Sequence, residues 1–371
     1  MRQMFLTLFL LLLRLFAAQA QQFPPLREVF APHFLIGTAI DYADHFDRDT
    51  VLSAFIRREF SAIVAANQMK ADHLQPRQGE YRFEDGDRLV RLARENGQTL
   101  TGHCLVWHSQ CPRWMFTDSL GQTVSRTELI RRMRDHIQTV VRHYSGQVRG
   151  WDVVNEAIEG DGRLRRTPYL DIIGPEYLRL AFQFAHEADP QAELYYNDYG
   201  MDSPAKREAV CRLVRELRSE GLRIDAVGMQ SHLSLWTNLT EYEKSMEAFI
   251  REGVKVMATE LDVSVLPWPG DEQGADVATH FDYQERLNPY RNGLPPEVER
   301  ELGDFYCRLF QIFMRHRRDI TRVTFWGTHD GVSWLNNFPI HGRTNYPLPF
   351  DRSLQPKPFV RRLVEMAESE P

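Results

Sequence analysis

The sequence predicts an α/β fold, a single (β/α)8 TIM barrel with its active site at the carboxyl ends of the strands. Three observations favour it. Short apolar, β-prone runs alternate with amphipathic segments along the chain, as in parallel strands joined by crossover helices. About eight such units fit into 371 residues, and that number closes a barrel. Carboxylate, amide, imidazole and indole side chains also gather where the apolar runs end.

The expected strands are spread over the whole chain. They are residues 35–40, 62–67, 99–107, 148–156, 192–199, 226–233, 255–263 and 321–328. Between them apolar residues recur at helical spacing, as at 130–144 and 177–185. A doubly wound open sheet is the alternative. It needs a glycine-rich phosphate turn after the first strand, and Gly37-Thr38-Ala39-Ile40 does not provide one.

Residues 1–20 are expected to form a signal peptide. Arg2 gives a cationic start, an apolar run follows at 5–13, and Ala18-Gln19-Ala20 fits the small-x-small cleavage pattern. A membrane anchor is the alternative, but the run is too short to span a bilayer and Arg14 interrupts it. We therefore expect cleavage near Ala20, a secreted or periplasmic protein, and no membrane contact after the signal is removed.

Residues 21–371 are expected to form one catalytic domain, because no linker or low-complexity tract divides them. A monomer is expected, since no exposed apolar stripe stands out. The formal charge of −6 favours solubility and gives no reason to bind nucleic acid. The four cysteines, Cys104, Cys111, Cys211 and Cys307, match no zinc pattern. An exported protein could pair them, and the sequence leaves that open.

Every expected strand ends in or near polar or aromatic side chains that suit a ligand site. A single one could be a satisfied hydrogen-bonding pair or a helix cap. A whole set in a barrel mouth lowers stability unless its members are paired or used. The candidates are Asn67, Lys70, His103, Trp107, Gln110, Asn155, Glu156, Tyr199, Gln230, His232, Glu260, Asp262, Trp326 and Trp334.

Two of these candidates, Glu156 and Glu260, are carboxylates at the ends of strands about two βα units apart. Cleavage of a glycosidic bond needs one acid to protonate the leaving oxygen and one carboxylate to meet the cationic carbon. Indoles that pack on sugar rings fit the same chemistry. No catalytic metal and no cofactor are expected: His103 and His108 would point to opposite faces of a strand, and no zinc spacing occurs.

These residues occur in motifs that resemble glycoside hydrolase family 10, the retaining endo-β-1,4-xylanases built on a (β/α)8 barrel. The resemblance runs from about Leu35 to Pro358. Its motifs are, in order, Asn67-Gln68-Met69-Lys70, the run at 102–110, Trp151-Asp152-Val153-Val154-Asn155-Glu156-Ala157, Asn197-Asp198-Tyr199, Gln230-Ser231-His232, Thr259-Glu260-Leu261-Asp262, and Phe325-Trp326-Gly327 with Ser333-Trp334.

The resemblance implies a role for each candidate. Glu156 would be the general acid and then the general base, and Glu260 the nucleophile. His232 and Asp262 would hold Glu260, and Asn155 would bond the sugar 2-hydroxyl beside the scissile bond. Tyr199 would face the aglycone side. The residues implied to line the glycone subsites are Asn67, Lys70, His103, Trp107, Gln110, Gln230, Trp326 and Trp334.

The implied activity is cleavage of internal β-1,4-xylosidic bonds of xylan by double displacement. The chain departs from the family at Ala66, where the family usually has Glu, and at Ala71, where it often has Trp. The missing carboxylate is expected to weaken hydroxyl binding two units from the cleavage point. Two alternatives therefore stay open: the same mechanism on another β-linked glycan or glycoconjugate, and a non-catalytic carbohydrate-binding barrel.

Overall fold

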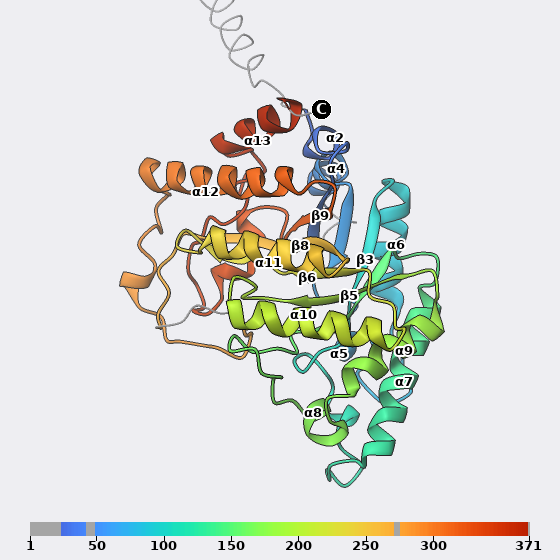
Figure 1. Ribbon diagram of the computed structural model, residues 1–371. Helices are drawn as coiled ribbons and strands as arrows, with labels where there is room; N and C mark the ends of the chain where they lie inside the picture. Colours follow the sequence, from blue (N-terminus) through green and yellow to red (C-terminus); the bar gives the residue numbers. More distant parts are fainter. Residues whose placement is uncertain (1–23, 42–48, 271–274, 370–371) are drawn as a thin grey trace, which may run out of the picture.

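The computed structural model describes residues 24–41, 49–270 and 275–369, and it forms a closed parallel barrel (Figure 1). Each strand pairs with its neighbours in chain order, and β9 pairs with β1 to close the ring. This confirms the predicted (β/α)8 barrel. The strands of the ring are β1 (Leu35–Ile40), β2 (Ala62–Ala65), β3 (Thr99–Val106), β4 (Gly150–Asn155), β5 (Glu193–Asp198), β6 (Ala226–Met229), β8 (Lys255–Ser264) and β9 (Ile320–Phe325).

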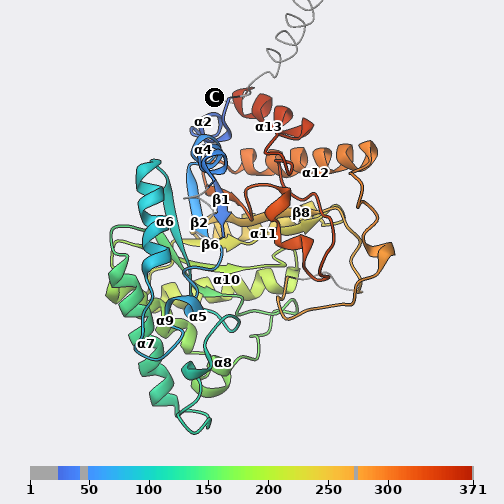
Figure 2. The same ribbon diagram turned by 180° about the vertical axis from the view of Figure 1, so that it is seen from behind.

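Helices follow the strands and cover the outside of the barrel, as the two opposite views show (Figures 1 and 2). The first and last described helices lie side by side at one end of the molecule. The helices are α2 (Leu26–Val29), α4 (Thr50–Glu59), α5 (Ala71–Leu74), α6 (Glu84–Glu95), α7 (Arg126–His143), α8 (Pro168–Ile173), α9 (Tyr177–Ala188), α10 (Pro204–Ser219), α11 (Leu239–Arg251), α12 (Pro296–Arg315) and α13 (Pro358–Ser369).

Capping residues mark the starts of two of the helices. Ser125 and Ser203 accept hydrogen bonds from backbone N–H groups in the first turns of α7 and α10, and Pro204 occupies the first position of α10. The apolar stripe of α7, which includes Met133 and Ile137, is buried against the strands and α9. These helices therefore fix the strands beneath them.

The strands are buried almost throughout, because helices cover the outside and side chains fill the inside. Trp151 of β4 is fully buried. Gly102 of β3 leaves the room for it, since a Cβ at position 102 would lie 2.1 Å from the Trp151 ring. The barrel below the active site is therefore a packed core.

The sixth expected strand, 226–233, is interrupted in the structure. β6 ends at Met229, and a separate short strand, β7 (His232–Ser234), continues along β8. Met229 pairs with Ala258 and His232 pairs with Asp262, so β8 contains one extra residue across the break. Ser231 at the break has φ of 67°, a conformation that alternation of apolar residues does not reveal.

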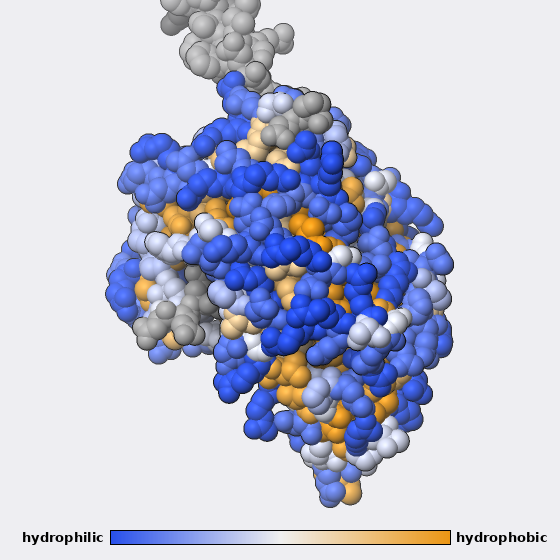
Figure 3. Space-filling view, in the orientation of Figure 1, coloured by the Kyte–Doolittle hydropathy of each residue, from blue (hydrophilic) through white to orange (hydrophobic). Residues whose placement is uncertain are grey.

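All four cysteines are unpaired, so no disulfide holds this fold. Within the described ranges, no helix is both long and apolar enough to cross a bilayer. The expected signal peptide and its cleavage site near Ala20 lie outside the described residues. Hydrophilic residues dominate the face seen in Figure 3, with hydrophobic ones in scattered patches between them.

Candidate active site

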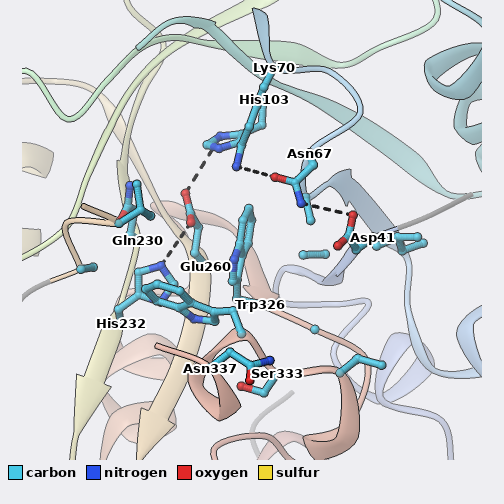
Figure 4. A pocket seen from close by; sticks show the side chains of 18 of the residues that line it. Asp41, Asn67, Lys70, His103, Gln230, His232, Glu260, Trp326, Ser333 and Asn337 are labelled. Atoms are coloured by element: carbon cyan, nitrogen blue, oxygen red, sulfur yellow. Dashed lines mark hydrogen bonds and ion pairs between the residues drawn. The ribbon is translucent and has the colours of Figure 1, made fainter. Parts of the chain in front are cut away.

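A cavity of about 590 Å³ opens at the carboxyl ends of the barrel strands (Figure 4). We call it the active-site cavity. Residues from seven of the eight expected strands meet there, although they are far apart in the sequence. The predicted residues that line it are Asn67, Lys70, His103, Trp107, Gln110, Asn155, Glu156, Gln230, His232, Glu260, Trp326 and Trp334.

Glu156 directly follows β4 and is only 4% exposed. The indole N–H of Trp107 donates to its Oε2 at 2.9 Å, and the Gln230 amide donates to its Oε1 at 2.9 Å. Burial raises the pKa of Glu156 to about 7, and these hydrogen bonds oppose the rise only in part. Glu156 therefore keeps its proton up to about neutral pH.

Glu260 lies within β8 and is 5% exposed. The Asn197 amide donates to its Oε1 at 2.7 Å, and His232 Nε2 lies 3.2 Å from its Oε2. Burial acts to raise the pKa of Glu260, but the hydrogen bond from His232 and the charges of His232 and His103 outweigh it, so the pKa is lowered. Glu260 is therefore ionised when Glu156 is protonated.

His232 bridges two carboxylates. Its Nδ1 lies 3.0 Å from Asp262 Oδ1, and its Nε2 faces Glu260. An imidazole can donate from both nitrogens only when it is protonated. Burial opposes that charge, but Asp262 and Glu260 raise the pKa of His232 to about 10. Trp334 Nε1 donates to the second oxygen of Asp262 at 2.7 Å. This contact holds Asp262 in place against His232, which in turn faces Glu260.

Amide side chains connect the two glutamates. Asn197 Nδ2 donates to Glu260 and, at 3.0 Å, to Asn155 Oδ1. Gln230 Nε2 donates to Glu156 and, at 3.2 Å, to the same Asn155 oxygen. Thr259 donates to Asn197 Oδ1 at 2.6 Å and so sets the direction of that amide. The carboxylates are therefore held in one rigid network before any ligand binds.

Lys70 lies on the β2 side of the cavity and is buried. Its Nζ donates to Asn67 Oδ1 at 3.0 Å and to Gln110 Oε1 at 2.6 Å, and it sits 4.8 Å from the centre of the Trp107 ring. Burial lowers the pKa of Lys70, with the glutamates acting in the opposite direction. A cation and two amides thus face one end of the cavity.

Aromatic rings form the wall near Glu260. Trp326 lies edge-on to His103, with centroids 5.5 Å apart, and to His232, with centroids 6.2 Å apart. Trp334 stacks on Phe338 at 4.3 Å between centroids. His103 Nδ1 is 2.9 Å from Asp152 Oδ2 and 4.0 Å from Glu260 Oε1. This wall is apolar on its faces and polar at its edges, which suits a sugar ring.

Two predicted residues do not line this cavity. Asp262 is fully buried behind His232 and contacts two residues of the lining, His232 and Trp334. Tyr199 lines a neighbouring cavity of about 310 Å³, and its hydroxyl accepts a hydrogen bond from Arg165. Its contact with the aglycone stays a prediction.

Sequence reasoning gave no role to three residues that the structure brings to the site. Asn197 stands in a quoted motif, but its bridging position needs the strand register to be seen. Asp41 lines the active-site cavity from the end of β1. Arg165 is buried and donates to the backbone oxygen of Glu156 at 3.1 Å and to Asp276 at 2.9 Å. Arg165 and Asp276 lie in loops, where no periodicity signals a buried role.

A set of side chains that could hold a cation lies elsewhere. In the described ranges, Glu243, Glu247 and His316 place ligand atoms close together, and none of them lines the active-site cavity. Arg315 already pairs with Glu243 at 2.8 Å.

Two glutamates with pKa values shifted in opposite directions, beside indoles and amides in a barrel mouth, are the groups that a glycosidase uses. The profile of glycosyl hydrolase family 10 matches residues 25–366, and the chain belongs to this family.

Known proteins of similar sequence and structure are described as xylanases. "Endo-1,4-beta-xylanase A" of Xylanibacter ruminicola is 48% identical over 95% of this chain and 96% of its own length. A solved GH10 endoxylanase from a sugarcane soil metagenome has a TM-score of 0.87 and 39% identity, covering 93% of this chain and 99% of its own. A xylanase of Paenibacillus barcinonensis, solved with a conduramine derivative, gives 0.83 and 38%, covering 93% and 99%.

Proposed function

We propose that this protein hydrolyses internal β-1,4-xylosidic bonds of xylan with retention of configuration. The observation that carries the proposal is the pair Glu156 and Glu260, buried in one cavity with their pKa values shifted in opposite directions. The relatives described as endo-1,4-beta-xylanases support xylan as the substrate.

In the first step, Glu156 donates its proton to the glycosidic oxygen and that C–O bond breaks. Glu260 attacks the anomeric carbon with a carboxylate oxygen and forms a glycosyl ester. His232 stays charged through its contact with Asp262, so Glu260 is an anion until the bond forms. Asn197 and Gln230 hold Asn155, and we expect Asn155 to bond the 2-hydroxyl of the reacting sugar.

In the second step, Glu156 acts as a base. Ester formation removes the negative charge of Glu260, and that charge is one of the causes that raise the pKa of Glu156. The pKa of Glu156 therefore falls, and its carboxylate takes a proton from the attacking water. Water oxygen bonds to the anomeric carbon, the ester breaks, and Glu260 leaves as a carboxylate. Two inversions give net retention.

The other two functions are weighed against the same residues. A binding-only barrel would not need Glu156 and Glu260 held with opposed protonation. A different β-linked glycan is favoured by one observation, the small side chains Ala66 and Ala71 at the glycone end. Ala66 lines the cavity, so it leaves space there for another ring or substituent.

Release of reducing ends from xylan, arabinoxylan, mixed-linkage glucan and cellulose, measured in parallel, tests the substrate. We expect the highest rates on the two xylans, with internal cleavage visible as a rapid fall in viscosity. Activity on glucan alone would favour the alternative glycan. A folded protein inactive on all four would contradict this proposal.

We also propose export, with the mature chain beginning near Gln21 and working outside the cytoplasm. The support is the sequence of residues 1–20. Mass spectrometry of the N-terminus of protein collected from the medium and the periplasm tests it. An intact Met1 on protein confined to the cytoplasm would contradict export.

A further inference from the structure

The backbone of Glu156 is bent where β4 ends. Its φ of 57° lies in the left-handed region, which a residue with a side chain seldom adopts unless its surroundings hold it there. Two hydrogen bonds do so. The Glu156 N–H donates to the carbonyl oxygen of Asn197 in β5 at 2.9 Å, and the Glu156 carbonyl oxygen accepts from Arg165 Nε at 3.1 Å. The bend is therefore held on one side by a strand and on the other by a loop residue.

The bend decides where the Glu156 carboxyl points. Asn155 and Glu156 are consecutive, and consecutive side chains of a straight strand point to opposite faces. Here both of them line the active-site cavity. The carboxyl can then accept from Trp107 and Gln230, at 2.9 Å each. If the Glu156 backbone were extended, the carboxyl would turn away from these donors and from the cavity.

Arg165 is 7% exposed, and all three nitrogens of its guanidinium have partners. Nε donates to the Glu156 carbonyl oxygen, and Nη1 lies 2.9 Å from Asp276 Oδ2. Nη2 lies 3.2 Å from Glu159 Oε2 and donates to the Tyr199 hydroxyl. Because the guanidinium is planar and rigid, the carboxylates that hold Nη1 and Nη2 also fix the direction of Nε.

The same guanidinium reaches the wall of the active-site cavity. Asp276 stands between Ala275 and Val277, which both line that cavity. Arg165 therefore joins the backbone of Glu156 to a wall segment 111 residues further along the chain. A buried guanidinium lowers stability unless its charge and its donors are satisfied, and two carboxylates satisfy the charge. The third contact, from Nε to the Glu156 carbonyl, is one that a purely stabilising ion pair does not need.

We propose that Arg165 is a positioning residue for the acid and base: it holds Glu156 in its left-handed conformation and so aims the carboxyl at the glycosidic oxygen. This inference rests on the proposed function. Arg165 then matters for the steps in which Glu156 transfers a proton. Attack by Glu260 on a sugar whose leaving group needs no proton does not depend on Arg165.

Two aryl β-xylobiosides separate these steps. The phenyl glycoside has a poor leaving group, which must be protonated as the bond breaks, whereas dinitrophenolate leaves without a proton. Arg165→Met keeps the length of the side chain and removes its donors. We expect it to lower kcat/KM on the phenyl glycoside about 10- to 100-fold, because the acid is misplaced. On the dinitrophenyl glycoside, kcat/KM should stay within about twofold of wild type.

Two further measurements separate positioning from folding. Arg165→Lys keeps the charge but not the planar fork, so it should show most of the same loss on the phenyl glycoside. In Arg165→Met, azide should raise kcat on the dinitrophenyl glycoside, because the ester is waiting for a misplaced base and azide needs no base. The burst of dinitrophenolate counts the working sites, and each rate is divided by that number.

Arg166→Met is the matched control. Arg166 is the next residue along the chain, its side chain is 84% exposed, and its ion pair is with Asp171. This variant should react at the wild-type rate on both glycosides. For Arg165→Met, an equal loss on both glycosides would mean a structural role and would overturn the inference. Wild-type rates on both glycosides would overturn it as well.

Asp276→Ala keeps the test decisive if the Arg165 variants do not fold. It removes the carboxylate that holds Nη1 and leaves Arg165 in place. We expect a loss of about two- to tenfold on the phenyl glycoside, without a matching loss on the dinitrophenyl glycoside. In that case an unchanged ratio of the two rates would overturn the inference. A wild-type protein that cleaves neither glycoside would instead remove the proposed function itself.

Discussion

At the scale of residues, the site gives two identical side chains opposite tasks by giving them different neighbours. Glu156 meets neutral donors, so burial dominates and its proton is retained. Glu260 meets a charged imidazole, so the ion is retained despite burial. The difference in pKa comes from which strand ends lie beside each glutamate. His232, which contacts Glu260, is the residue that separates the two pKa values.

The pH dependence of kcat/KM follows from these shifts. The alkaline limb should fall near pH 7, because activity needs Glu156 protonated and its pKa is about 7. The acid limb should lie below the ordinary glutamate range, because Glu260 must be ionised and its pKa is lowered. Initial rates on an aryl β-xylobioside across the pH range measure both limbs.

Replacement of the acid supplies the control for that profile. In Glu156→Gln the alkaline limb should disappear, and the rate on substrates with poor leaving groups should fall by roughly 10² to 10⁴-fold. An alkaline limb near pH 7 that survives in Glu156→Gln would assign it to another group.

The sequence was sufficient for the pair but not for all of its neighbours. Glu156 and Glu260 end apolar runs, which is a local pattern. Asp41 and Asn197 reach the site through pairing between strands, which no local pattern encodes. Position 66 shows the consequence. Compared with the family, the sequence lacks a carboxylate there, whereas the pairing of β1 with β2 places the carboxylate of Asp41 beside Ala66.

At the scale of elements, strand existence was predictable and strand ends were less so. Apolar runs mark β4 and β8 clearly, since both are buried over nearly their whole length. The break between β6 and β7 was not predictable, because it depends on the φ of Ser231 and on the hydroxyl contact with Tyr242 at 2.7 Å. The break matters because β6, which ends just before Gln230, and β7, which begins at His232, pair with β8 in registers that differ by one residue.

Helix α10 is tied to β5 by a buried ion pair. Lys206 and Asp198 are both unexposed, with 2.7 Å between Nζ and Oδ1. Lys206→Met should lower the free energy of unfolding by about 3–5 kcal/mol, because it leaves the Asp198 carboxylate buried without its partner. Urea denaturation measures this.

The exposed ion pair Arg361–Glu365 on α13 is the control for the buried pair Lys206–Asp198. Arg361→Met should change the free energy of unfolding by less than about 1 kcal/mol. If Lys206→Met were as mild as Arg361→Met, the buried pair would not be what anchors α10.

At the scale of the whole molecule, counting strand–helix units predicted the closed barrel, because eight parallel units have one compact solution. Buried residues in loops, such as Arg165, could not be predicted, because loops have no regular spacing of buried positions. The face seen in Figure 3 carries hydrophobic residues in scattered patches, and the monomer stays a prediction.

The monomer is tested by light scattering after size-exclusion chromatography. We expect the mass of a single chain across the concentration range used in assays. A mass of two chains that persists on dilution would contradict the prediction.

The central claim is that Glu260 is the nucleophile and Glu156 the acid and base. Glu260→Ala should lose activity by roughly 10⁴-fold or more. With azide and an activated aryl β-xylobioside, it should form the α-glycosyl azide, because azide enters through the space left by the carboxylate. Glu156→Ala should form the β-glycosyl azide, since its nucleophile still makes the ester. NMR of the two products decides: the α-azide from Glu260→Ala and the β-azide from Glu156→Ala support the account, and the reverse assignment would contradict it.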